Sequence, residues 1–384
     1  MKKAWKLYFA LLLTILCLTG CWDFQEPNQL AFITGVALDL TNDGQFEISS
    51  QIAIPSVIGG QDSGGGGENK KSFRVVSAAG KNIMDAGQNL QTQISRALFY
   101  GHRQTILIGQ RMAEHGVGNF LDMFIRNPQS ELRSTIYVVK DGLGKDLLSL
   151  EPIFDPYTAT ALVNEQASLG LKPYFYRKFL SDALSQGIHP LLPAVSSTSL
   201  KKYTYAGTAV FNKDDGMKLV GFLDTKKSYY ANWILDRLNG FTVTAFVPEG
   251  NGIVSLQLQS LDRQIRSKKV KDQIQIEVRL TGKGLLVENS SNLDPTKRKD
   301  LRIIQDKLSQ TTQKSIQQLI EKVQKQYNTD IFGFGQSVHE QHPHKWKALK
   351  QEWNKIFAEL SVSVEVDLQC KDPGQTTTSF MGIP

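Results

Sequence analysis

Apolar and polar residues recur at regular intervals along residues 31–187, and these intervals predict short strands and helices. From Phe46 to Ile54 apolar side chains favour every second position, whereas from Ile83 to Ala97 they recur every three or four positions. The strands expected by these criteria are 31–40, 45–54, 73–76, 105–108 and 135–139. The expected helices are about 80–98, 117–125, 143–150, 155–168 and 173–186. Because strands and helices alternate along this part of the chain, its pattern predicts a mixed or parallel α/β sheet.

Turn residues divide this pattern. Asn42-Asp43-Gly44 is a turn signal, so the first two strands are expected to form a hairpin. Gly187 ends the last of the expected helices. The stretch from His189 to Ser199 is then rich in proline and serine, which predicts a linker over 188–202.

The second half, 203–370, shows a different pattern of longer alternating segments and long helices. In residues 273–280 the apolar side chains share one face and the polar ones share the other, which is typical of a half-buried antiparallel strand. The strands expected here are 203–211, 217–223, 241–247, 253–260, 273–280 and 362–368. The expected helices are about 230–238, 296–327 and 344–358.

Together the two patterns predict a multidomain body with mixed sheets, of class α/β plus α+β. The N-terminal part, 31–187, is expected to be an α/β domain. The C-terminal part, 203–370, is expected to be an α+β region with an antiparallel sheet and long helices, as one unit or as two subdomains. The polar residues 371–384 are expected to form a flexible tail.

The start of the chain decides where this body is expected to lie. Three lysines precede an almost wholly apolar run over residues 7–18, which predicts a secretory signal too short to span a bilayer. The run ends in Leu18-Thr19-Gly20-Cys21, which resembles the lipobox of bacterial lipoproteins. The resemblance implies removal of residues 1–20, a diacylglyceryl group on the Cys21 sulfur and, as an option, an acyl chain on its nitrogen. The alternative is a plain secretory signal with a chance cysteine, but the charged start, the length and the box together favour the lipoprotein signal.

The number of cysteines and the net charge limit the classes of function that are expected. Cys17 leaves with the signal and Cys21 is the lipid site, so Cys370 alone remains and forms no internal disulfide. A catalytic thiol at Cys370 has no local signature, and a small residue at a strand end is the favoured interpretation. The formal net charge of +7 falls to +4 without the three signal lysines, which indicates weak attraction to anionic lipid and gives no reason to expect nucleic acid.

The mature body starts with a short polar tether, 21–30, and is long enough for two or three domains. No second apolar run approaches about 18 residues, so the sequence predicts no further membrane span. The hydrophobic content of 41% and the charged content of 21% are those of a folded globular protein.

Several stretches taken together resemble one family. They are Cys21-Trp22-Asp23, LAFITGVALDL (30–40), SRALFYGHRQTILIG (95–109), AGTAVF (206–211), LVGFLD (219–224), DIFGFG (330–335) and KWKALKQEWNKIF (345–357). Each stretch alone is weak, but the ordered set with the lipobox is similar to the Ger(x)C family of spore germination lipoproteins, the C subunits of germinant receptors.

This resemblance implies a lipid-anchored subunit on the outer face of the inner spore membrane. It would assemble with a partly membrane-embedded A-type subunit and a permease-like B-type subunit in response to nutrients such as amino acids or sugars. The family implies a multidomain α/β body, and it brings no catalytic residues, cofactor or metal to this sequence. The only functional residue that it carries over is the lipid-bearing Cys21.

Several residues are candidates for a functional role but also have a structural interpretation. His339, His342 and His344 suggest a metal site, but no cysteine or acidic pair stands at ligand spacing, which favours a helix-entrance loop. Trp346 and Trp353 share one helix face, where packing in the core is favoured over a partner groove.

Three further segments also have both a functional and a structural interpretation. Tyr100-Gly101-His102 leads into a strand and could line a pocket, but a histidine satisfied inside the fold is favoured. Asp214-Asp215 is expected at an exposed hairpin turn and not in a catalytic dyad. The glycine-rich stretch 59–67 lacks the Lys-Ser/Thr ending of a phosphate-binding loop, so a flexible loop tip is expected.

The sequence therefore predicts a non-enzymatic lipoprotein subunit of a germinant receptor. One alternative is a solute-binding lipoprotein of a transporter, which would need two similar lobes with ligand groups between them. A second is a lipid-anchored hydrolase, which would need a nucleophile beside a base, and no such motif is present.

Overall fold

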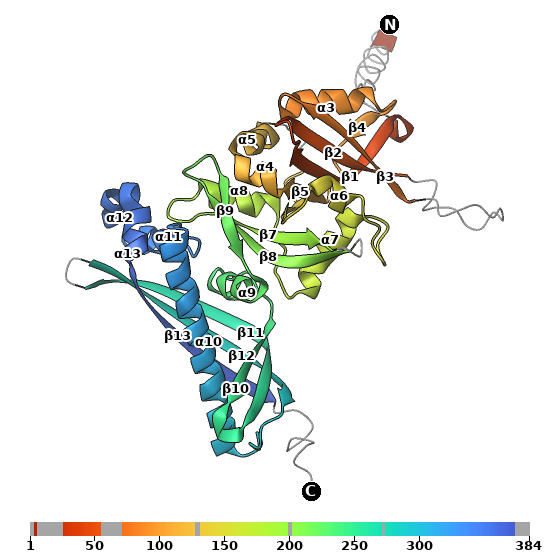
Figure 1. Cartoon of the computed structure of the whole chain (residues 1–384). Coiled ribbons are helices and arrows are strands. Elements are labelled where there is room, and N and C mark those ends of the chain that lie inside the picture. The colour runs from red at the N-terminus through yellow and green to blue at the C-terminus, as the bar shows by residue number, and fades with distance from the viewer. Residues whose placement is uncertain are drawn as a thin grey trace, which may run out of the picture.

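Two β-sheets organise the chain in the computed structural model, which describes residues 4–5, 26–54, 71–126, 131–198, 202–270 and 273–372 (Figure 1). The strands of the first sheet are β1 (Leu30–Leu40), β2 (Phe46–Ala53), β3 (Phe73–Gly80), β4 (Ala97–Phe99), β5 (Thr105–Gly109), β6 (Thr135–Val139), β7 (Leu191–Ser197), β8 (Tyr203–Asn212) and β9 (Lys218–Leu223). Their order is β3-β2-β1-β5-β6-β7-β8-β9, and β4 pairs with β1 beside this path. Parallel pairing joins β1, β5, β6 and β7, while both ends of the sheet are antiparallel, so the sheet is mixed as predicted.

Helices cover both faces of the first sheet because its buried strands are apolar on both sides. Val36 and Leu38 on β1 face one core, and Ala37 between them faces the other. One face packs against α3 (Ile83–Thr92), α4 (Gln110–His115), α5 (Gly118–Arg126) and α8 (Tyr176–Leu184). The other packs against α6 (Gly144–Leu148) and α7 (Thr158–Ser168).

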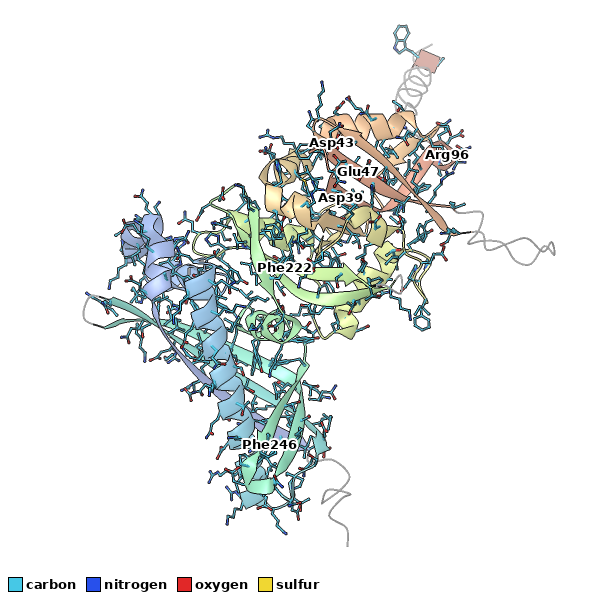
Figure 2. All side chains as sticks on the ribbon, viewed as in Figure 1. Asp39, Asp43, Glu47, Arg96, Phe222 and Phe246 are labelled. Carbon is cyan, nitrogen blue, oxygen red and sulfur yellow. The ribbon has the colours of Figure 1, made fainter. Side chains whose placement is uncertain are left out.

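One buried carboxylate fixes α6 on this sheet. Asp39 on β1 accepts hydrogen bonds from the backbone N–H groups of Gly144 (2.7 Å) and Lys145 (2.9 Å) at the start of α6. Burial raises the pKa of Asp39 to about 6, although these two donors lower it. The Lys145 ammonium lies 3.0 Å from Glu47 on β2, next to Asp39 in the labelled view (Figure 2).

The second sheet is a twisted ribbon of four strands, packed on one face against a long helix (Figure 1). Its strands are β10 (Phe241–Val247), β11 (Gly252–Val270), β12 (Gln273–Asn289) and β13 (Ser361–Asp372), in that order. The helices of this part are α9 (Thr225–Ile234), α10 (Arg298–Gln326), α11 (Phe334–Gln341), α12 (Pro343–Leu349) and α13 (Trp353–Glu359). Ile276, Val278 and Leu280 are buried beneath α10, as their alternation predicts.

The structure corrects two predictions in the first half. The helix predicted over 80–98 ends at Thr92, and Ala97–Phe99 forms β4 instead, because these residues pair with the start of β1. The linker predicted over 188–202 is wrong for Leu191–Ser197, which forms β7 between β6 and β8. Pro193 is accommodated because β6 pairs with β7 only at Ala194 and Val195.

Three further differences concern the second half. The hairpin 203–223 extends the first sheet as β8 and β9 and does not join the second. The second sheet is not wholly antiparallel, since α10 crosses back over it and makes β13 parallel to β12. The helix predicted over 344–358 is divided by a 3-10 turn at Lys350–Glu352, and α11 precedes it where no helix was expected.

Some predicted features lie outside the described residues. They are most of the signal 1–20, the lipid site Cys21, the glycine-rich stretch 59–67 and the tail from residue 373, whereas Lys371 and Asp372 end β13. Within the described ranges no helix combines the length and the apolar character needed to cross a bilayer.

Candidate functional site: an interdomain junction and a surface groove

Residues 330–335 join α10 to α11 and fold around one carboxylate. Asp330 is fully buried, and its Oδ1 accepts hydrogen bonds from the backbone N–H groups of residues 332, 333 and 334 at 3.1, 3.0 and 3.2 Å. Its Oδ2 accepts from the N–H of Gly335 (2.7 Å) and from the indole Nε1–H of Trp353 (2.9 Å). Burial raises the pKa of Asp330 to about 6, although the surrounding donors lower it. The carboxylate thus satisfies the free N–H groups where α11 begins.

The same loop contacts the first half of the chain through its backbone. The N–H of His189 donates to the carbonyl oxygen of Asp330 (2.7 Å), and the N–H of Gln336 donates to that of Gly187 (3.0 Å). A Cβ at Gly335 would lie 2.6 Å from Trp353 Nε1 and 2.7 Å from Gly187 Cα. Only glycine fits there, so the DIFGFG stretch is the joint between the two halves.

A buried histidine extends this joint. The backbone N–H of Lys213 donates to His189 Nδ1 (3.2 Å), so the ring proton is on Nε2, which donates to Asn354 Oδ1 (3.1 Å). Asn354 in turn donates to Asp214 Oδ2 (2.8 Å). Burial lowers the pKa of His189 to about 4, so the ring is neutral at neutral pH. Asp214 and Asp215 lie in the turn between β8 and β9, and Asp215 pairs with Lys218, which confirms the predicted turn.

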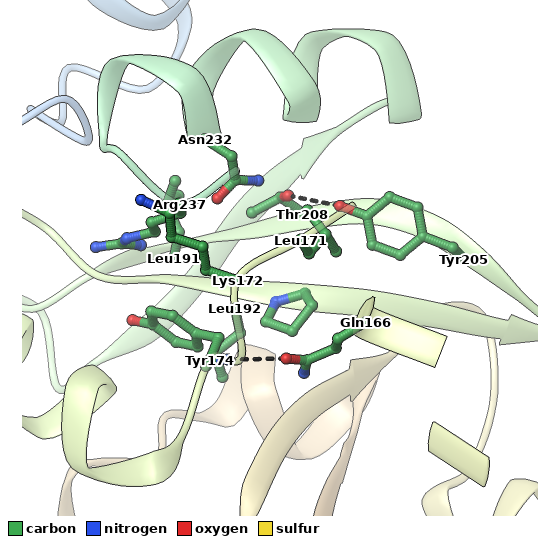
Figure 3. A pocket seen from close by; sticks show the side chains of 11 residues that line it. Gln166, Leu171, Lys172, Tyr174, Leu191, Leu192, Tyr205, Thr208, Asn232 and Arg237 are labelled. Atoms are coloured by element: carbon green, nitrogen blue, oxygen red, sulfur yellow. Dashed lines mark hydrogen bonds between the residues drawn. The ribbon is translucent and has the colours of Figure 1, made fainter. Parts of the chain in front are cut away.

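A second polar cluster also links the two halves, and Figure 3 labels two of its members, Tyr174 and Arg237. Arg237, just after α9, forms a buried ion pair with Asp182 on α8 at 2.5 Å, and its guanidinium lies 4.8 Å from the ring centre of Tyr174. The Tyr174 hydroxyl donates to the same carboxylate at 2.8 Å. Nearby, Leu171 and Leu238 form an isolated bridge between the halves.

The pocket beside this cluster is small. Gln166, Tyr174 and Thr208 are among the side chains around it, and Figure 3 shows the Gln166 carboxamide turned to the Tyr174 backbone, whose N–H donates to it at 2.8 Å. Its volume is about 20 Å³, which is room for about one water molecule. The pocket therefore has no space for an amino acid or a sugar as it is built here.

Several of the side chains singled out in the sequence turn out to be structural. Trp346 and Trp353 are buried with ring centres 5.3 Å apart, which confirms the core prediction. Trp346 also donates to Gln186 (2.7 Å), so both indoles help to hold the junction. His339 stacks on Trp346 and His342 Nε2 lies 3.1 Å from the Ser267 carbonyl oxygen. In the part of the chain that the structure describes, no three potential ligands gather as a metal site.

Two other predictions have different outcomes. His102 is exposed and touches Phe32 and Phe99, so the prediction of an internal histidine was wrong. The physical reason is the pairing of β4 with β1, which leaves the turn at 101–102 at the surface. Cys370 is half-buried near the end of β13, and burial raises the pKa of its thiol, which disfavours a reactive thiolate.

A surface groove of about 760 Å³ lies between α3 and α5, and Tyr100 contributes to it. Its apolar lining includes Ile48 on β2, Leu98 on β4 and two methionines, Met84 and Met123, one on each flanking helix. Met84 is 58% exposed, although it sits beside this apolar surface. The polar part of the lining is mixed: Gln88, Gln91 and Asn119 are uncharged, whereas Arg103, Asp122 and Arg126 are charged. Asp122 and Arg126 pair with each other on α5 at 2.7 Å.

No motif in the sequence identifies the junction or the groove directly. An aspartate at the start of a hexapeptide with two glycines, DIFGFG (330–335), is a signal for an Asx-type turn, and it marks Asp330 as a candidate cap. His189 and Arg237 are found only from the folded chain, because their partners lie up to 165 positions away.

Comparisons with known proteins cover nearly the whole chain. The family described as "Spore germination protein N-terminal domain" matches residues 23–197, and "Spore germination B3/ GerAC like, C-terminal" matches residues 206–374. The boundary between the two matches lies at the β7–β8 connection, inside the first sheet.

Curated relatives and one solved structure agree with these matches. YfkR of Bacillus subtilis (strain 168) is 30% identical over 94% of this chain and 95% of its own length. Spore germination protein KC of the same organism is 24% identical over 95% of this chain and 94% of its own, and spore germination protein B3 is 23% identical over 96% and 98%. The crystal structure of the GerBC protein matches the fold with a TM-score of 0.56 at 20% identity, over 91% of this chain and all of that one.

Proposed function

Because the chain belongs to the Ger(x)C family of spore germination proteins, we propose that it is the C subunit of a spore germinant receptor. One observation carries the proposal: the two family matches begin two residues after Cys21, run through β13 and leave only residues 198–205 between them unmatched. In this proposal the subunit assembles with A-type and B-type membrane subunits that respond to nutrient germinants.

The lipid anchor is the physical basis of the proposed mechanism. The diacylglyceryl group on Cys21, with or without an N-acyl chain, would hold the body at the outer face of the inner spore membrane. Confinement to a thin layer raises the effective concentration of the body near its membrane partners. The body then acts by binding and needs no catalytic group, which fits buried carboxylates such as Asp39 and Asp330 that bond to backbone N–H groups.

The first experiment is Cys21→Ala in the full chain, followed by membrane fractionation and a nutrient germination assay. Loss of membrane association together with slower germination is expected. A soluble variant that germinates at the wild-type rate would refute the anchoring mechanism.

The second experiment is an affinity pull-down from detergent-solubilised spore membranes. Recovery of A-type and B-type subunits with the wild type supports the receptor assignment. Recovery of transporter components instead would favour the solute-binding alternative, in which nutrient should also raise the melting temperature of the isolated body. The pocket of about 20 Å³ beside Arg237 has no room for such a ligand, whereas a cleft of about 500 Å³ with Lys178, Ile188 and Phe332 in its lining lies between the two halves. The melting temperature, and not the pocket volume, therefore decides between the two functions.

A further inference from the structure

The groove between α3 and α5 lies close to the point where the body meets its membrane tether. In the pairing of β1 with β4, Leu30 lies opposite Ala97 and Ala31 lies opposite Leu98, and Leu98 lines the groove. Only eight residues, 22–29, lie between Cys21, the proposed lipid site, and the start of β1 at Leu30. The nine steps along the chain from Cys21 to Leu30 span at most about 30 Å. The start of β1, and with it the groove, is therefore held within a distance of that order from the bilayer.

The opposite end of the molecule has no such constraint. Figure 2 labels Arg96, just before β4, and Phe246, on β10, at the two ends of the molecule. Phe246 is 53% exposed at the end far from the tether. Of these two ends, the one with the groove is therefore positioned to meet a membrane partner.

The shape and lining of the groove indicate what it can bind. A concave surface between two helices does not accept a flat bilayer, but it accepts one convex element such as a helix. The facing methionines, Met84 and Met123, are flexible and polarisable, and methionine is frequent where a protein surface adapts to the apolar face of a bound helix. The polar side chains of the lining, both the uncharged Gln88, Gln91 and Asn119 and the charged Asp122 and Arg126, can hydrogen-bond to the polar face of the same helix.

We propose that this groove binds an amphipathic helix of a membrane subunit of the receptor. The apolar face of that helix lies on Ile48, Leu98 and the two methionines, and its polar face meets the glutamines of α3. This inference rests on the proposed function, since the membrane subunit is the one that the tether brings within reach. Binding there completes the apolar contacts that α3 and α5 leave open to solvent.

Gly87 offers a clean way to fill the groove. It lines the groove on α3, and a Cβ built on it meets no atom within 4 Å. A larger residue also favours the helical backbone more than glycine does, so Gly87→Phe should fold. The matched control is Thr92→Phe, an exposed position on the same helix that does not line the groove.

The test uses the full lipidated chain in spores. Gly87→Phe is expected to lower co-purification of the A-type or B-type subunit by at least about tenfold, while its membrane fractionation stays at the wild-type level and Thr92→Phe behaves as wild type. Equal co-purification of the two variants would overturn the inference. If the wild type itself recovers no membrane subunit, the proposed function fails first, so the two failures are distinguishable.

A photo-crosslinking residue at Gln88 identifies the occupant directly. The expected product joins this chain to an amphipathic segment of a membrane subunit, and the same residue at Thr92 gives none. A product with lipid, with another part of this chain or with a second copy of it overturns the inference, as does the absence of any product.

Discussion

The junction between the two halves and the groove on the first domain differ in whether their side chains have partners within the chain. At the junction, Asp330, His189 and both tryptophans bond to partners inside the chain. In the groove, Met84 is more than half exposed, and Gly87 faces open space. The junction is therefore a closed set of contacts that stabilises the fold, whereas the groove leaves apolar surface exposed to solvent. Changes at the junction should therefore lower the stability of the protein, and changes in the groove should leave it intact.

The largest effect is expected from Asp330→Ala. Five buried donors lose their acceptor, and unsatisfied buried groups cost about 1–3 kcal/mol each before the structure relaxes. We expect the free energy of unfolding to fall by about 4 kcal/mol, measured by urea denaturation with tryptophan fluorescence. Asp306→Ala, on the exposed side of α10, is the control and should change little. A loss below about 1 kcal/mol would show that the Asp330 cap does not hold the joint.

The next effect concerns the buried pair of Arg237 and Asp182. Arg237→Met keeps most of the side-chain volume but leaves the carboxylate of Asp182 without its buried partner. Lys178 still reaches the other oxygen of that carboxylate at 2.9 Å, so we expect a loss of about 3 kcal/mol, at the low end for such a pair. Adding Asp182→Leu should recover part of the loss in thermal unfolding. A double variant less stable than the single one would mean that packing, and not the uncompensated charge, dominates.

Local patterns of apolar residues and turn residues predict most of the strands and helices. The hairpin at Asn42-Asp43-Gly44 forms as expected, with Gly44 at a φ of 82° and Leu40 opposite Phe46. The long helix α10 lies within two residues of its predicted ends. These features depend on turn chemistry and periodicity, which neighbouring residues alone determine.

Long-range pairing produced the errors. The apolar spacing that predicted a helix to residue 98 also fits β4, and the choice is made by the distant β1. The prolines and serines of 190–199 suggested a linker, but β6 and β8 on either side recruit β7 into the sheet. The groove could not be predicted from the sequence either, since its lining comes from strands and helices spread over residues 48–126. Only the pocket-lining possibility at Tyr100 pointed toward it.

The third prediction concerns pH at the junction. The pKa of Asp330 is about 6 in the folded protein, above its ordinary 3.8, so between these values the folded state binds a proton that the unfolded state has released. Its contribution therefore lowers stability as the pH rises from about 4 to about 6, by on the order of 3 kcal/mol. His189 acts in the opposite sense, because its pKa is about 4 in the folded protein, below the ordinary 6.5. Its contribution lowers the stability of the protein as the pH falls from about 6.5 to about 4.

The measurement is the free energy of unfolding between pH 4 and 7 for wild type, Asp330→Asn and His189→Asn. Asp330→Asn should make the stability rise more steeply with pH than in wild type, and His189→Asn should make it rise less steeply. Asp39, whose pKa is also raised to about 6, stays in all three proteins, so its effect cancels in the comparison. The same pH dependence in all three would contradict the raised and lowered pKa values at the joint.

The smallest effect, and the only gain, is expected in the groove. Gly87→Ala removes a glycine from the middle of α3 and adds a Cβ that meets nothing within 4 Å, so stability should rise by about 0.5–1 kcal/mol. Gly335→Ala, in α11, is the matched change at the junction, where the added Cβ would lie 2.6 Å from Trp353 Nε1, and it should cost about 1–3 kcal/mol. Thermal unfolding of both variants under one condition gives the sign of each change. The same glycine-to-alanine substitution on a helix would then stabilise the protein in the groove and destabilise it at the joint. A loss of stability in Gly87→Ala would mean that the groove is already packed in the free protein and has no room for a partner.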